Sequence, residues 1–117
     1  MIDRTCARTD NEYEWGVHVA FFAERAGLGA AEIEALAKGG WDDAVWTAAE
    51  QAILRLADEL HDTAAISEAA WEDLRAHFDE AQVLELIALA GFYRTVAYYC
   101  NGLKLPLESY GAALPTA

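Results

Sequence analysis

The sequence feature that most constrains the fold is a long apolar stretch near the C-terminus, between Val83 and Leu103. Drawn as a helix, it carries large apolar residues on nearly every side: Val83, Leu84, Leu86, Ile87, Leu89, Phe92 and Val96. Such a helix has to be covered on several sides. Because Glu85 and Arg94 make membrane insertion costly, we expect a buried core helix. One small domain supplies few covering layers, so we also expect a homo-oligomer.

The rest of the chain also shows helical patterns. Capping residues and a 3.6-residue period predict helices over about 11–26, 30–38, 42–61, 67–78 and 79–101. The first is capped by Asp10 or Asn11 and stops at Gly27, and the last begins in a capping box of Asp79 and Gln82. No segment alternates cleanly between apolar and polar residues, and no Asn-Gly or Asp-Gly turn occurs. The sequence therefore predicts one all-α domain of about five helices over residues 1–117.

Charge and cysteine usage argue against several kinds of partner and chemistry. The chain has 20 acidic and 8 basic residues, a net charge of −12, and no basic cluster. We therefore expect neither nucleic acid nor a membrane as a partner. The N-terminal residues lack the apolar run of a signal peptide, which predicts a cytoplasmic protein. Cys6 and Cys100 match neither a Cys-x-x-Cys motif nor a zinc pattern, so we expect two buried free thiols.

Chemically useful side chains are concentrated between Asn11 and His18. Glu14 and His18 are four residues apart, and residues at this spacing share one face of a helix. A carboxylate beside an imidazole makes a general acid/base pair. The alternative is an exposed helix pair that contributes only a few tenths of a kcal/mol, roughly. A metal site that adds His61 or His77 is a weaker alternative without a second paired motif, and we expect no bound metal.

Further residues are candidates for contact with a ligand. Trp15 and Tyr93 could line a pocket, although aromatic residues at helical spacing more often belong to the core. Arg94 lies on an otherwise apolar helix, and a buried arginine needs a partner. That partner is either an acidic side chain across a subunit interface or a substrate carboxylate. Arg4 and Arg25 are weaker candidates for the same anion-holding role.

The motif and its surroundings resemble the carboxymuconolactone decarboxylase family of the alkylhydroperoxidase D-like superfamily. The resemblance covers most of the chain and depends on the order and spacing of several short motifs: Tyr13-Glu14-Trp15-x-x-His18, Ala26-Gly27-Leu28-Gly29-x-x-Glu32-Ile33, Ala57 to His61, Asp79 to Gln82, Tyr93, and Asn101 with Pro106-Leu107. It implies an alkylhydroperoxidase D-like bundle of five or six helices. Similar proteins form dimers, trimers and hexamers.

The chain departs from the family pattern in two ways. Redox members carry two cysteines at the positions of Asn11 and Glu14, and peroxidase chemistry needs both an attacking and a resolving thiol. Thiol peroxidase activity through Cys6 or Cys100 is therefore the weakest alternative. Family members also carry a preceding helix or two, with a proton-relay acid whose position falls just before the first residue here. We expect a missing N-terminal helix, ending near Arg4, or a protein without that acid.

The resemblance implies a cofactor-independent enzyme that decarboxylates or isomerises a small organic acid or lactone. It assigns catalysis to Glu14 and His18, and we predict substrate contact for five more residues: Arg4, Asn11, Trp15, Tyr93 and Arg94. The sequence contains neither a GxGxxG motif nor a P-loop, and we expect no cofactor. The alternative is a non-catalytic, oligomeric binding or scaffold protein with the same fold.

Overall fold

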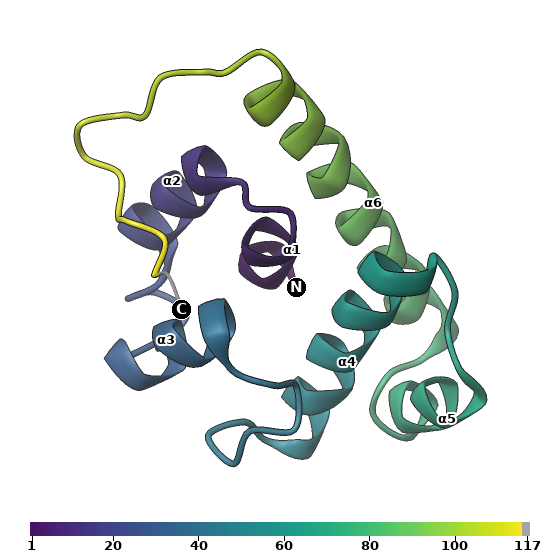
Figure 1. Cartoon of the computed structure of the whole chain (residues 1–117). Coiled ribbons are helices and arrows are strands. Elements are labelled where there is room, and N and C mark those ends of the chain that lie inside the picture. Colours follow the sequence, from purple (N-terminus) through teal and green to yellow (C-terminus); the bar gives the residue numbers. More distant parts are fainter. Residues whose placement is uncertain (116–117) are drawn as a thin grey trace.

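Six helices form the part of the chain that this computed structural model describes, residues 1–115. They are α1 (Ile2–Arg8), α2 (Glu12–Phe22), α3 (Ala30–Lys38), α4 (Ala48–Thr63), α5 (Glu68–His77) and α6 (Glu80–Gly102), and no strand occurs in this range. Helix α1 lies in the middle, with α2, α3, α4 and α6 around it, and α5 packs against α4 at one edge (Figure 1). The predicted all-α class is confirmed for these residues.

Helix α1 covers residues where the sequence analysis expected only the end of a preceding helix, near Arg4. It has only seven residues, and no side chain caps its N-terminus. Its residues Arg4, Thr5 and Cys6 are nevertheless buried, because four other helices pack around it. Tertiary burial, rather than any local propensity, therefore explains why this short segment is helical.

Capping side chains set most of the other helix starts. The side-chain oxygens of Asn11, Ser67 and Asp79 each accept a backbone N–H bond at the start of α2, α5 and α6. The predicted start of α4 near Asp42 is wrong. The helix instead begins at a capping box of Thr47 and Glu50, and the residues before Thr47 form turns.

Two apolar clusters fill the interior. The first joins α1, α2, α3 and the start of α4 through Cys6, Trp15, Ala35, Leu36, Trp46 and Leu54. The second joins α4, α5 and α6 through Ala52, Leu56, Leu74 and Val83. Because α4 contributes to both clusters, it connects the central helix to the peripheral α5–α6 pair.

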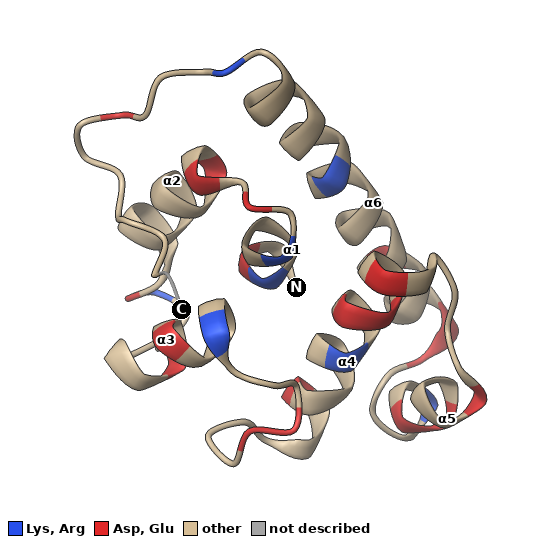
Figure 2. Ribbon diagram, viewed as in Figure 1, with Lys and Arg blue, Asp and Glu red and all other residues tan. Residues whose placement is uncertain are grey.

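The prediction that the apolar C-terminal helix is a buried core helix is wrong for the single chain. Helix α6 turns Val83, Ala90 and Ala97 inward, whereas Leu84 and Phe92 are 67% and 60% exposed. Only 22% of the most apolar 18-residue stretch of α6 is buried. By length and composition alone, α6 could span a membrane. Core helices pass the same test, so this is weak evidence for a membrane. Figure 2 shows few charged segments along α6.

The segment after α6 runs back along α2 (Figure 1). The backbone N–H of Ala112 donates to the carbonyl of Gly16 at 3.1 Å, and the indole N–H of Trp15 donates to Ala113 O at 3.3 Å. A Cβ atom at Gly16 would lie 2.8 Å from Ala112 O. Glycine at this position therefore allows the C-terminal segment to approach α2 closely.

Candidate functional site

Helix α2 places Glu14 beside His18, as the four-residue spacing predicts. Glu14 Oε1 lies 3.5 Å from His18 Nε2, and the two side chains are 19% and 15% exposed. Asn11 fixes the start of this helix, because its Oδ1 accepts the backbone N–H of Glu14 at 3.2 Å. The pair is therefore mostly enclosed, unlike an ordinary ion pair on an open helix surface.

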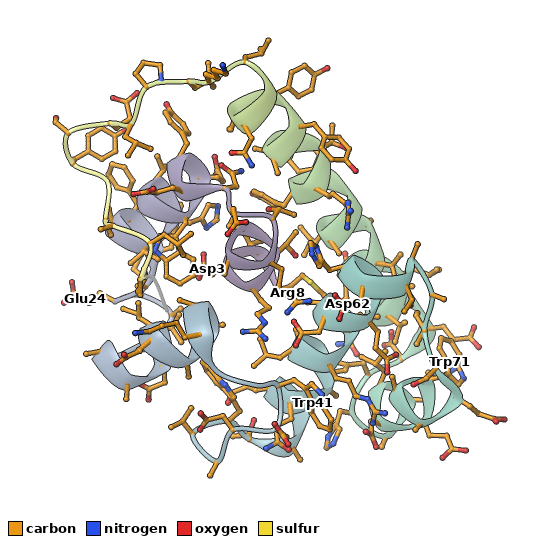
Figure 3. All side chains as sticks on the ribbon, viewed as in Figure 1. Asp3, Arg8, Glu24, Trp41, Asp62 and Trp71 are labelled. Carbon is orange, nitrogen blue, oxygen red and sulfur yellow. The ribbon has the colours of Figure 1, made fainter. Side chains whose placement is uncertain are left out.

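Helix α1 adds a carboxylate that the sequence motif did not contain. Asp3 Oδ1 lies 3.8 Å from His18 Nδ1, and Figure 3 places Asp3 on the side of α1 that faces α2. The two ring nitrogens of His18 therefore face different carboxylates, Asp3 on one side and Glu14 on the other. Sequence spacing could not identify Asp3, because the packing of α1 against α2 brings it to His18.

Tyr93 of α6, predicted to contact substrate, instead contacts His18 and completes the cluster. Its hydroxyl lies 3.4 Å from His18 Nε2, and its ring meets the imidazole edge-on at 5.5 Å between centroids. Burial raises the pKa of Tyr93, and the negative charges of Glu14 and Asp3 raise it further. The phenol therefore keeps its proton at neutral pH and is available as a donor at Nε2.

The environment of Asp3 also differs from that of a surface carboxylate. Its Oδ1 is buried and has no hydrogen-bond partner in the described part of the chain. Burial raises the pKa of Asp3, and the nearby His18 opposes this rise. A carboxyl group of raised pKa beside an imidazole is an arrangement that recurs at sites of proton transfer.

Asp3 and His18 line an open cavity of about 490 Å³. This volume falls within the range of small-ligand sites, roughly 300–1,000 Å³. Its walls are largely apolar and include Ile2, Phe22, Leu28, Leu36, Ile53 and Leu89. Besides His18, its ionisable side chains are Asp3 and Glu50, and no lysine or arginine contributes to the lining. Glu14 and Tyr93 lie at the other ring nitrogen and do not line the cavity.

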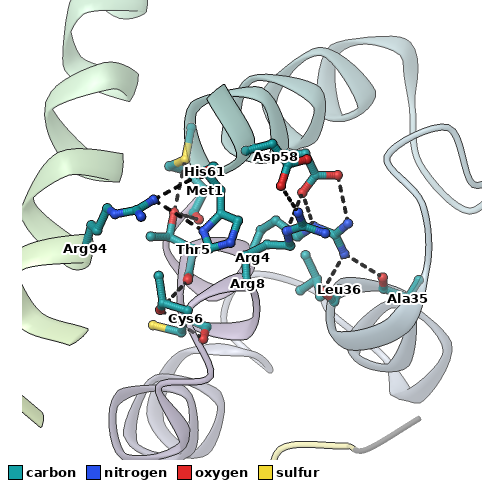
Figure 4. Close-up of polar contacts among 12 residues, drawn as sticks. Met1, Arg4, Thr5, Cys6, Arg8, Ala35, Leu36, Asp58, His61 and Arg94 are labelled. Carbon is teal, nitrogen blue, oxygen red and sulfur yellow. Dashed lines mark hydrogen bonds and ion pairs between the residues drawn. The ribbon is translucent and has the colours of Figure 1, made fainter. Parts of the chain in front are cut away.

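Arg4, expected to hold a substrate carboxylate, lies away from this cluster. Its Nε and Nη2 donate to the two carboxylate oxygens of Asp58 at 2.7 and 2.8 Å. Its Nη1 donates to the carbonyl of Leu36 at 2.8 Å (Figure 4). The guanidinium is buried, and each of its three nitrogens donates to a group within the fold. Arg4 therefore connects α1 to α3 and α4 and is not free to bind a ligand.

Arg94 also lies away from His18. Its Nη1 donates to the carbonyl of His61 at 3.3 Å, and its Nε donates to the Tyr98 hydroxyl at 2.9 Å. It forms no ion pair with a carboxylate in the described part of the chain. A cation beside a C-terminal carbonyl of α4 interacts favourably with the helix dipole, so Arg94 has a structural role here.

Two other predicted contact residues are part of the framework. Trp15 is fully buried in the first apolar cluster and holds the C-terminal segment, and Asn11 is a fully buried helix cap. Sequence reasoning missed a different tryptophan. Trp46 lines the cavity, and its buried indole nitrogen has no partner among the described residues.

The two cysteines are buried free thiols, as expected. Burial raises the pKa of Cys6 to about 12, and burial also raises the pKa of Cys100. Thiols that stay protonated at neutral pH are poor nucleophiles, so the structure does not favour thiol peroxidase chemistry. Within residues 1–115, no group of three or more potential ligand side chains is arranged to hold a metal ion.

Together, these residues form an imidazole flanked by two carboxylates and a phenol, at the wall of a largely apolar cavity. Such a set can accept a proton, store it and return it, which suits proton transfer at carbon. Asp3, Glu14, His18 and Tyr93 come from three different helices, α1, α2 and α6. No known protein family, no curated protein and no solved structure matches this chain.

Proposed function

We propose that this protein is a cofactor-independent acid/base enzyme similar to carboxymuconolactone decarboxylases. It decarboxylates or isomerises a small lactone or organic acid. The observation that carries the proposal is the position of His18, between Asp3 and Glu14 at the wall of the cavity. The proposal includes the alkylhydroperoxidase D-like form of the bundle, a cytoplasmic location and a homo-oligomeric state.

The geometry supports distinct roles for the two residues of the sequence motif. His18 lines the cavity, so it is the group that exchanges a proton with a substrate carbon. Glu14 faces Nε2 from outside the cavity, where it orients the ring and balances its charge. Asp3 lies at Nδ1 within the cavity and takes the place of a proton-relay acid. Glu14 is therefore a positioning residue in this mechanism.

The lining of the cavity favours one of the two substrate classes. A free carboxylate would meet the side chains of Asp3 and Glu50, and no lysine or arginine lines the cavity. The α-amino group of Met1 lies near Asp3, but burial lowers its pKa and so disfavours its charged form. A neutral lactone ring avoids that repulsion and suits the apolar walls. Because such a ring has no carboxylate to lose as carbon dioxide, this lining favours isomerisation over decarboxylation. We therefore expect unsaturated lactones to be better substrates than dicarboxylates.

The test is a turnover screen on small unsaturated lactones, keto acids and dicarboxylates, followed by mass spectrometry for loss of carbon dioxide and by NMR for isomerisation. His18→Gln should abolish turnover, whereas His77→Gln, on the exposed α5, should leave it unchanged. Thermal shifts on the same compounds separate binding from catalysis. Turnover that survives His18→Gln would contradict the proposal.

The second candidate is a non-catalytic binding protein with the same fold. The distances of 3.5 and 3.8 Å from the carboxylates to His18 favour it, since both exceed the length of a good hydrogen bond. Equal thermal shifts in wild type and His18→Gln, without turnover by either, would support this candidate.

A further inference from the structure

A second open cavity lies between α1, α4 and α6, away from His18. Its inner part has a volume of about 200 Å³, and its outer part has a volume of about 510 Å³. The two parts adjoin, because Thr9, His61 and Arg94 line both of them. Neither part shares a lining residue with the cavity beside His18. The second cavity is therefore a separate feature of the fold.

Small and apolar residues form the walls of the inner part. They include Ala57, Leu60, Ile87 and Ala90. Gly91 also lines the inner part, and a Cβ atom there would meet no atom within 4 Å, so packing within the chain does not require this glycine. For comparison, an apolar cavity of roughly 150 Å³ can hold a benzene ring. The inner part is therefore large enough for one aromatic ring.

The outer part is cationic, in contrast to the cavity of the candidate site. Arg8, Arg94 and His61 contribute to its lining. The two arginines are notable in a chain that has 8 basic residues and a net charge of −12. Asp10 is the one acidic residue among the described residues that line this part. Arg8 is already paired with Asp62, so Arg94 is the arginine left to bind an anion.

The guanidinium of Arg94 has donors to spare at the junction of the two parts. It reaches from α6 to the end of α4, where Nη1 donates to the carbonyl of His61 (Figure 4). Its Nε donates to the Tyr98 hydroxyl at 2.9 Å. Its Nη2 donates to no group in residues 1–115. Arginine binds carboxylates through strong, charge-assisted hydrogen bonds. Nη2 of Arg94 is therefore available to a carboxylate ligand.

His61 supplies a second donor at the same junction. Its Nδ1 lies 3.4 Å from Arg94 Nη1, so a neutral ring accepts at Nδ1 and carries its proton on Nε2. Burial lowers the pKa of His61, and the charges of Arg8 and Arg94 lower it further. The opposing effects of Asp62 and Asp58 are smaller. The nearby acids therefore leave an excess of positive charge at His61, which favours an anion there.

We propose that the second cavity binds a small aromatic carboxylate, with its ring in the inner part and its carboxylate between Arg94 and His61. A single negative charge matches the one arginine that lacks a carboxylate partner in the described part of the chain. Asp10 repels an anion from the outer end and so favours this inner position. The inference does not rest on the proposed function, because the two cavities share no lining residue.

The first test is calorimetric titration of the full chain with benzoate, and with two probes that each lack one half of it. Benzyl alcohol keeps the ring without the charge, and acetate keeps the charge without the ring. We expect benzoate to bind with a Kd of about 1 mM or tighter, and each of the other probes to bind about tenfold more weakly or worse. Absence of saturable benzoate binding up to about 20 mM, a limit set well above that Kd, would overturn the proposal. Equal affinity for benzoate and either partial probe would also overturn it.

The second test locates the bound benzoate. Arg94→Met should weaken binding about tenfold or more, because a charge-assisted hydrogen bond is lost. Arg75→Met is the matched control, since it changes the net charge equally but removes an exposed pair with Glu80 on α5. It should leave the affinity unchanged, and circular dichroism checks that both variants are folded. Equal affinities in wild type and Arg94→Met would contradict the assignment.

A third measurement on the wild type needs no arginine variant and separates the two cavities. The ring-proton NMR signals of His61 should shift as benzoate is added, and those of His18 should not. His18→Gln, which should abolish turnover at the candidate site, should leave benzoate affinity unchanged. Loss of binding in His18→Gln, or shifts at His18 alone, would place benzoate in the first cavity and overturn the proposal.

Discussion

Asp3, which the proposed mechanism uses as a proton-relay acid, destabilises the fold. Its carboxylate is mostly buried, and its Oδ1 has no hydrogen-bond partner among the described residues. Burial raises its pKa above the ordinary value of 3.8. For an acid whose pKa is higher in the folded state, stability falls as the pH rises through the interval between the two pKa values. Above that interval, the ionised Asp3 lowers the free energy of unfolding.

The change Asp3→Asn should therefore stabilise the protein at pH 8 by on the order of 1 kcal/mol, because no charge is then desolvated. The gain should shrink below pH 4, where Asp3 is protonated in both states. Urea unfolding at the two pH values measures the effect. The exposed Asp62→Asn should change stability by less than about 0.5 kcal/mol. A loss of stability at pH 8 for Asp3→Asn would show that the carboxylate is well satisfied in the fold.

The two thiols should be unreactive in the folded protein. Burial raises the pKa of Cys6 to about 12 and also raises the pKa of Cys100, so little thiolate exists at pH 8. A thiol reagent such as DTNB should react with both cysteines only after unfolding in denaturant. Added peroxide should be consumed no faster by wild type than by the double variant Cys6→Ser/Cys100→Ser. Rapid labelling of the native protein would restore the thiol alternative.

At the scale of the helix, capping residues and the apolar period correctly predicted the helices whose ends depend on nearby residues. Ser67 and Asp79 cap α5 and α6 as expected, and the predicted range 30–38 matches α3. Helix α1 has no capping signal, and its helical state depends on the helices around it. Two adjacent acidic residues near position 42 resembled a helix start, but the stronger capping box five residues later begins α4.

The mostly buried pair of Arg4 and Asp58 connects elements far apart in the sequence through two hydrogen bonds. It connects α1 to α4, and Arg4 also bonds the last turn of α3 (Figure 4). Removing Arg4 leaves the mostly buried Asp58 with only Arg8 Nε, 3.7 Å from its Oδ1, so Arg4→Ala should cost about 3 kcal/mol in chemical unfolding. Arg8→Ala removes the exposed pair with Asp62 and only this longer contact with Asp58, so it should cost less than about 1 kcal/mol. The double variant Arg4→Met/Asp58→Leu should recover much of the loss, and equal costs for Arg4 and Arg8 would contradict this assignment.

For the whole molecule, the site divides into a part that sequence spacing predicts and a part that only packing reveals. Glu14 and His18 share one helix, so their separation of four residues was enough to pair them. Asp3 reaches His18 across a contact between two helices, and Arg4 was directed into the core by the same packing of α1. No spacing rule distinguishes a substrate-binding arginine from one that meets Asp58 54 residues away.

The C-terminal segment provides the last test, because it covers α2 next to the site. A Cβ atom at Gly16 would lie 2.8 Å from Ala112 O and 3.2 Å from Ala112 N, so Gly16→Ala should displace this segment. We expect a loss of about 1–3 kcal/mol, faster proteolysis after α6 and red-shifted tryptophan fluorescence as Trp15 loses its cover. Gly102→Ala is the control, since a Cβ atom there meets nothing within 4 Å. Unchanged proteolysis in Gly16→Ala would mean that the segment does not depend on this close approach to α2.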